Sequence, residues 1–394
     1  MSPRREPHAI QGRVRLRQTL RSAVVLAFAG LGCTTAKEQV DTTTCHACEG
    51  ARAPLCTTGD AAPGAAASGE CLRVVDTYDG TNALGEMIND LSISAVWSPL
   101  NDGYVLSGAE GPLRLLRVGS EAPAFTKLAE YDGQNDRIFV DWSPDGNSAL
   151  SGCNDVRLLS VSRDPPALTE RAIYTGHVGS VYSVAWSPDG KYALTAGQDS
   201  SVRLLGVDVD GGTLTELAVF RGHTRKAYQA SWVDAKTAWT AGQDGTARWL
   251  AIETSPPSIR ELARITEEEP VTVAAPSPRG DRLLVGTWGL CNVVELWALE
   301  AKTHSTRLVS VFRGHAPLVR AFAWRGDGMR AMSGGHNDTV RYFDVTESGL
   351  VNTATLDGYA AGVHAMALSA DGTRLLVTAS HVDRLTLLDV GSCP

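Results

Sequence analysis

The chain has 394 residues, of which 43% are hydrophobic and 20% are charged, and its 39 glycines suit a fold with many tight turns. This composition excludes a disordered or fibrous chain. The formal net charge of −8 argues against nucleic acid as a partner, because phosphate binding requires a clustered positive surface and the arginine-dense segment is confined to residues 1–21.

Residues 1–32 have the pattern of a secretory signal peptide. Several arginines precede a charge-free run at 22–35, which is too short to cross a bilayer comfortably. Two cleavage patterns compete: residues 27–29 (Ala-Phe-Ala) match the small-x-small rule, and residues 30–33 (Gly-Leu-Gly-Cys) resemble a bacterial lipobox with glycine in place of the usual leucine. We predict an exported cell-envelope lipoprotein, anchored through lipid on Cys33 and not by a spanning helix. Ordinary secretion, to the periplasm or beyond, is the alternative.

Residues 33–70 are predicted to form a flexible tether, because their Thr, Ala and Gly runs offer no periodic apolar face. The tether contains Cys45, Cys48 and Cys56. Haem attachment would need a histidine directly after Cys48, where Glu49 stands. A zinc site would need two short cysteine pairs, which the spacing does not supply. Disulfides are therefore favoured in an oxidising compartment, and neither a cofactor nor a metal is predicted.

Residues 71–394 repeat at intervals of 44 to 48 residues. Alignment on Ser-Pro-Asp-Gly turns places seven residues at one position: Trp97, Trp142, Trp186, Trp232, Pro276, Trp324 and Leu368. In the third unit, β-branched and aromatic alternation predicts strands at 181–186, 192–196, 202–207 and 214–220, separated by turn sequences. We therefore predict an all-β, seven-bladed propeller of four-stranded antiparallel blades.

The repeats resemble the WD40 family, because three of them contain the Gly-His pair of that family, with the histidines at His177, His223 and His315. In that family the histidine, a Ser or Thr, an Asp and a Trp form a buried hydrogen-bonded chain. The resemblance implies three such sets: His177, Thr195 and Asp199; His223, Thr240 and Asp244; and His315, Ser333 and Asn337. Leu205, Leu250 and Phe343 replace the tryptophan, and Trp297 keeps it. We expect weaker networks and more apolar packing between blades.

These His-Ser/Thr-Asp sets also contain the groups of a catalytic triad. Their recurrence in several blades indicates an architectural role, so no catalytic residue is predicted. Cys153 and Cys291 are placed at the Asp position of blades two and five, where we interpret them as unpaired, buried thiols. Residues 208–211 (Asp-Val-Asp-Gly) lack the further ligands that calcium would need.

The two ends of the repeat region are predicted to share the last blade. The final unit stops after its third strand, at 385–390, and residues 72–78 align with the missing fourth strand. Pairing the ends would remove an exposed sheet edge. The same alignment predicts a disulfide between Cys71 and Cys393, and pairing of Cys56 with Cys71 is the competing arrangement.

The resemblance also implies a face on which partners dock, formed by the loops that enter each first strand. The matching positions are Ile93, Ile138, Tyr182, Tyr228, Thr272, Arg320 and His364, with Gln198, Gln243 and His336 beside them. Tyrosine and arginine are favoured anchors of protein interfaces; the alternative is that these residues merely line a solvated channel mouth. We predict a non-catalytic, extracytoplasmic scaffold that binds a protein or peptide. The second hypothesis is a hydrolase or lyase acting at the channel mouth, which the regular repeat lengths disfavour.

Overall fold

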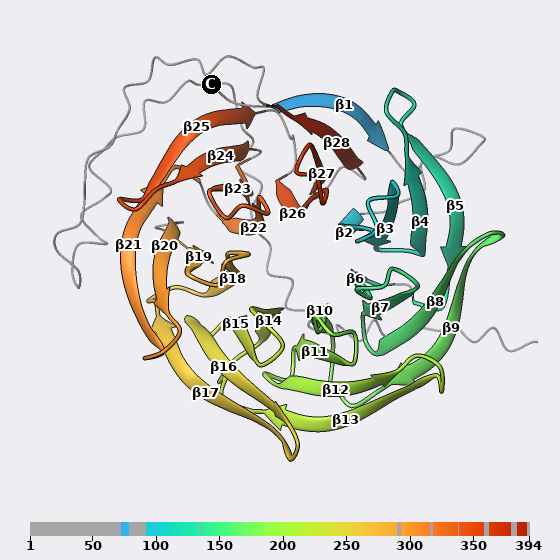
Figure 1. The fold of residues 1–394 in the computed structure, drawn as a ribbon, viewed down its shortest axis with the longest axis horizontal. Helices are drawn as coiled ribbons and strands as arrows, with labels where there is room; N and C mark the ends of the chain where they lie inside the picture. Colours follow the sequence, from blue (N-terminus) through green and yellow to red (C-terminus); the bar gives the residue numbers. More distant parts are fainter. Residues whose placement is uncertain are drawn as a thin grey trace, which may run out of the picture. The chain divides into compact units, whose positions relative to one another are not determined.

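The computed structural model describes residues 72–78, 92–134, 136–289, 293–315, 318–337, 339–357, 362–379 and 384–391. These residues form seven antiparallel sheets of four strands each, arranged around one axis (Figure 1). The prediction of an all-β, seven-bladed propeller is confirmed. The described part of the chain contains no helical segment long and apolar enough to span a bilayer.

In blades one to six the strands follow one another in chain order from the axis outward, and in the last blade β1 lies outside β28 (Figure 1). Blades one and two comprise β2 (Ser92–Trp97), β3 (Tyr104–Ala109), β4 (Leu113–Val118), β5 (Phe125–Tyr131), β6 (Phe139–Trp142), β7 (Ser148–Gly152), β8 (Val156–Arg163) and β9 (Pro166–Tyr174). Blades three and four comprise β10 (Val181–Trp186), β11 (Tyr192–Gly197), β12 (Val202–Asp208), β13 (Thr213–Phe220), β14 (Ala227–Trp232), β15 (Thr237–Gly242), β16 (Thr246–Thr254) and β17 (Pro257–Thr266). Blades five and six comprise β18 (Val271–Pro276), β19 (Arg282–Thr287), β20 (Val293–Glu300), β21 (Ser305–Arg313), β22 (Val319–Trp324), β23 (Arg330–Gly335), β24 (Thr339–Val345) and β25 (Leu350–Asp357). The last blade comprises β26 (Val363–Leu368), β27 (Arg374–Ala379), β28 (Arg384–Val390) and β1 (Leu72–Tyr78).

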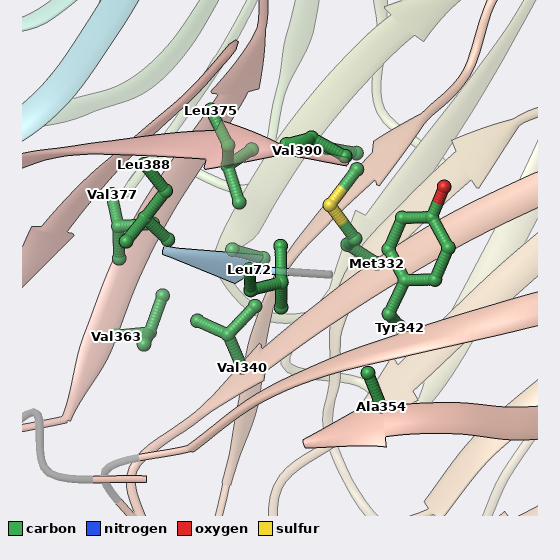
Figure 2. Packing of buried hydrophobic residues seen from close by; sticks show 12 residues of the cluster. Leu72, Met332, Val340, Tyr342, Ala354, Val363, Leu375, Val377, Leu388 and Val390 are labelled. Atoms are coloured by element: carbon green, nitrogen blue, oxygen red, sulfur yellow. The ribbon is translucent and has the colours of Figure 1, made fainter. Parts of the chain in front are cut away.

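The ring closes by pairing the two ends of the repeat region, as predicted. Strand β1 runs antiparallel to β28, with Leu72 opposite Val390 and Tyr78 opposite Leu385. Leu72 is buried in the core between blades six and seven, where it lies among Val340, Leu375 and their neighbours (Figure 2). Each such apolar core joins two adjacent blades, so β1 stabilises the ring through packing as well as through the hydrogen bonds of its ladder.

Several predicted residues lie outside the described residues. The lipidation residue Cys33, the signal peptide and the tether belong to this group, as do Cys71, Cys291 and Cys393. The predicted bridge between Cys71 and Cys393 therefore stays a prediction.

The innermost strands of adjacent blades are joined by tryptophan side chains at the aligned repeat position. The indole N–H of Trp142 donates to the Val96 carbonyl at 3.2 Å, and that of Trp232 donates to the Ala185 carbonyl at 3.1 Å. Trp97 and Trp324 make the equivalent bonds to the preceding blade. In four repeats the tryptophan thus ties one blade to the preceding one, whereas the indole N–H of Trp186 is buried and makes no such bond.

Candidate functional site

The three predicted histidine sets are brought together inside blades three, four and six. His177 Nε2 lies 2.8 Å from Thr195 Oγ1, and its Nδ1 lies 3.0 Å from Asp199 Oδ1. His223 has the same two contacts, with Thr240 at 2.9 Å and Asp244 at 3.0 Å. His315 contacts Ser333 at 2.6 Å and Asn337 at 3.0 Å. All three histidine rings are buried.

Burial favours the neutral form of His177 and of His315. It lowers the pKa of His177, and it lowers the pKa of His315 to about 4, where Asn337 offers no charge to compensate. The pKa of Asp199 is well below its usual range, because hydrogen bonds from Ser201 and His177 outweigh the effect of burial. In each set the hydroxyl is held by a buried ring inside a sheet. The arrangement stabilises the blade and presents no open nucleophile.

An arginine that the sequence reasoning missed extends two of these networks. Arg203 lies 3.0 Å from Asp199 and 2.5 Å from Glu216, and Arg248 contacts Asp244 and Glu261 in the same way. Each arginine lies four residues after the aspartate. A strand places alternate side chains on one face, so this spacing was a usable signal. The networks are therefore more extensive than the loss of the tryptophan led us to expect.

Blade two has a network of the same design with different residues. Gln134 replaces the histidine: its amide donates to Asp155 at 2.6 Å, and its carbonyl oxygen accepts from Ser151 at 2.6 Å. Asp155, and not Cys153, is therefore the counterpart of Asp199, and our placement of Cys153 at the Asp position was wrong. Cys153 is a free, buried thiol, as we expected.

The former tryptophan positions carry buried apolar side chains. Leu205, Leu250 and Phe343 are fully buried in the cores between blades. The retained Trp297 donates its indole N–H to Glu295 at 2.8 Å. Valine occupies the Thr195 position in that blade, at Val285, so the family's hydroxyl partner is missing there.

The predicted docking residues occupy a recurrent irregularity of the innermost strands. In every blade except blade two the pairing register shifts around a single extra residue, which is Ile93 in blade one and Thr272 in blade five. In blades three, four, six and seven this residue has a large polar side chain and is Tyr182, Tyr228, Arg320 or His364. Such a residue is the extra one of a β-bulge, which re-aims its side chain relative to the regular alternation. All four side chains are half-buried.

Blade two lacks this bulge, and the prediction for it was wrong. Its pairing is regular from Phe139 to Trp142, so successive side chains alternate without interruption. Ile138 is consequently fully buried in the core, and Phe139 takes the place beside the bulge residues. Its ring packs edge-on against Tyr182 at 6.4 Å, and Tyr182 packs edge-on against Tyr228 at 5.9 Å.

Positively charged side chains lie near the aromatic row formed by Phe139, Tyr182 and Tyr228. The ammonium of Lys226 lies 5.6 Å from the centre of the Tyr182 ring. Arg320 donates from Nη1 to His364 Nδ1 at 2.8 Å, which requires a neutral His364 with its proton on the other nitrogen. Burial lowers the pKa of Arg320, and nearby Arg137 lowers it further. Burial likewise raises the pKa of the Tyr228 hydroxyl.

A second set of equivalent positions lies beside the bulge residues. The backbone N–H groups of Gln198, Gln243 and His336 donate to the carbonyl two residues before the bulge residue of the same blade. Trp288 makes the same bond in blade five, and 44% of its surface is exposed. An exposed tryptophan at this position is a strong interface candidate that the sequence reasoning missed.

A pocket of about 370 Å³ opens beside Tyr182 and Phe139. Arg137, Glu110 and Asp136 form its charged wall, and the Cys153 thiol also borders it. Arg137 pairs with Glu110 at 3.0 Å, and burial raises the pKa of Cys153, which keeps the thiol protonated. Within the described ranges, no group of three or more His, Cys, Asp or Glu residues is placed to hold a metal ion.

Comparisons with known proteins match parts of this ring. The family model for the WD domain, G-beta repeat, matches residues 168–204 and 306–344. A stretch of 91 residues is 36% identical to the "Probable cytosolic iron-sulfur protein assembly protein 1" of Mycosarcoma maydis, covering 19% of this chain. The match spans 20% of that relative's length, so it informs on the repeats and not on the whole relative.

Proposed function

We propose that this chain, a seven-bladed β-propeller of the WD40-repeat family, is a non-catalytic scaffold that binds a protein or peptide partner on the face carrying Tyr182 and Tyr228. The observation that carries the proposal is the row of Phe139, Tyr182 and Tyr228 beside Arg320 at the start of the innermost strands. Aromatic side chains and arginine supply most of the binding energy at protein interfaces.

The chemistry of the blades supports a scaffold over a hydrolase or lyase. The hydroxyls of Thr195, Thr240 and Ser333 each lie against a histidine inside a sheet, and none of these residues is exposed. The accessible bulge residues include two tyrosines, an arginine and a histidine that accepts a hydrogen bond from the arginine, and the hydroxyl of the bulge residue Thr272 donates to the Val319 carbonyl. This set favours recognition over proton transfer or nucleophilic attack.

The proposal includes export and a lipid anchor on Cys33. It is supported by the basic segment, the charge-free run at 22–35 and the cysteine that follows it. The relative named as cytosolic matches over 91 residues, which is too short to transfer its location. Labelling cells with radioactive palmitate should mark the full chain and leave Cys33→Ser unlabelled. Equal labelling of both proteins would contradict the anchor.

A cross-linking pull-down tests the binding face. The full chain and the variant Tyr182→Ala/Tyr228→Ala would be used to recover proteins from membranes of the producing cell. A matched control, Met329→Ala/Val351→Ala, removes two exposed apolar side chains from turn and outer-strand positions. The tyrosine variant should lose the partners that the wild type and the control recover. Equal recovery by all three proteins would refute the proposed face.

A further inference from the structure

We infer that Arg320 receives a carboxylate from an aspartate or glutamate side chain of the protein partner. This inference rests on the proposed function, because it specifies what the bulge face recognises. It begins from a half-buried cation whose partner is neutral: Arg320 donates to His364, and among the described residues no carboxylate pairs with it.

The buried network arginines show how this chain treats such a charge elsewhere. Arg203 contacts Asp199 and Glu216, and Arg248 contacts two carboxylates in the same way. Taking a guanidinium out of water is unfavourable unless opposite charge and hydrogen bonds replace the lost hydration. Among the residues that the structure describes, no carboxylate supplies that replacement to Arg320. A ligand that brings a carboxylate would complete it.

The neighbouring charges favour a single negative charge over a phosphate. Arg137 is already paired with Glu110, and Lys226 lies over the Tyr182 ring. His364 must stay neutral to accept from Arg320. Among the described residues, Arg320 is therefore the cation of this group that has neither a carboxylate nor an aromatic ring as its partner. A monoanionic carboxylate balances it and fits the fork of guanidinium N–H groups.

The surroundings define what lies next to the acidic residue in the partner. Phe139, Tyr182 and Tyr228 form an aromatic wall from blades two to four, and Trp288 is exposed on blade five. Such a wall binds apolar side chains and excludes water from the ion pair, which strengthens it. The expected target is an acidic residue flanked by apolar or aromatic residues.

Selection from a random dodecapeptide library displayed on phage tests the inference, with the immobilised full chain as target. The wild type should enrich peptides with Asp or Glu at one fixed position. In the strongest binder, replacing that residue by Gln or Asn should weaken binding at least ten-fold. Arg320→Gln should lose affinity for the acidic peptide by a similar factor and bind the neutral peptide within two-fold of wild type. The control Arg279→Gln, at an exposed turn following β18, should behave as wild type.

The outcomes separate the two proposals. Selected peptides that need Tyr182 and Tyr228 but show no acidic position would overturn the carboxylate inference and leave the binding face standing. Tighter binding of the peptide carrying phosphoserine in place of the acid would also overturn it. Failure to enrich any peptide above empty beads would count against the binding face itself. Two controls exclude misfolding of Arg320→Gln as the cause. Replacing the acid in the peptide leaves the protein unchanged, and Arg320→Lys keeps the positive charge at this position.

Discussion

The carboxyl group of Asp141 should make the stability of the ring depend on pH. Asp141 lies on β6, and its two oxygens accept the backbone N–H groups of Trp142 at 3.0 Å and Trp186 at 2.8 Å. Burial raises its pKa from the usual 3.8 to about 7, although both hydrogen bonds favour the ionised form. Between these two values the folded chain binds more protons than the unfolded chain, so the free energy of unfolding falls as pH rises.

The magnitude follows from the size of the shift. A difference of about three pKa units corresponds to at most about 4 kcal/mol of stability, present below pH 4 and lost by about pH 7. Asp141→Asn removes the titrating group, and it sacrifices one acceptor, because its amide nitrogen cannot accept from a backbone N–H. The variant should therefore be destabilised by about 1–3 kcal/mol at pH 4.5 and should gain on the wild type as pH rises.

Urea unfolding at pH 4.5, 6 and 8 measures this difference. The gap in unfolding free energy between Asp141→Asn and the wild type should change by about 3 kcal/mol between pH 4.5 and pH 8, in favour of the variant at high pH. Asp210→Asn, at an exposed turn, removes one negative charge without touching a blade interface and serves as the control. A gap for Asp141→Asn that stays constant within about 1 kcal/mol would refute the reasoning.

Three further substitutions test the buried network, the blade contacts and the closure. Thr240→Val should cost about 1–3 kcal/mol in denaturant unfolding, because it leaves buried His223 without its hydroxyl partner; a neutral effect would contradict the network. Trp232→Phe should cost at least about 1 kcal/mol, because it removes the indole bond to the preceding blade as well as packing, and no change in the unfolding midpoint would argue against that contact. Cys71→Ser should lower stability by up to roughly 5 kcal/mol in oxidised but not in reduced protein if Cys71 pairs with Cys393, and recovery of a Cys56–Cys71 peptide in non-reducing mapping would contradict that pairing.

The fold was predictable because one period governs the whole ring. A tryptophan in five of the seven units and turns related to Ser-Pro-Asp-Gly recur at a nearly constant interval. Each of the four strands predicted for the third unit agrees with the structure within one residue at either end. The closure followed from the same alignment, which matched residues 72–78 to a fourth strand, and strand β1 completes the last blade. Because the units repeat, the strands predicted for one unit could be assigned to the other units, and this predicted the arrangement of the whole ring.

The errors arose where one blade departs from the period. Ile138 was assigned to the docking face because it aligns with Tyr182, but the missing bulge in β6 shifts the alternation by one residue and buries it. Cys153 was assigned to the Asp position because blade two has Gln134 in place of the histidine that anchors the alignment. Sequence alignment records which residues correspond, and a bulge changes which way they point.

The environment of Arg320 could not be predicted from its own repeat. Its partner His364 belongs to the next blade, 44 residues away, and the nearby Tyr228 and Arg137 come from blades four and two. Only the closed ring brings these residues around one axis. The electrostatic environment of Arg320 therefore depends on charged and polar residues from several blades, and the sequence of one repeat does not predict it.

The bulges also separate the residues that stabilise the ring from those available for binding. The histidine networks lie inside the sheets, whereas Tyr182 and Tyr228 are extra residues that the pairing pattern of β10 and β14 does not use. Replacing such a residue removes no cross-strand pair, so its identity can vary without disturbing the ladder. The seven blades thus keep one architecture while the bulge residues differ from blade to blade. Because the bulge residues do not take part in strand pairing, substitutions at these positions can change the specificity of the binding face without changing the fold.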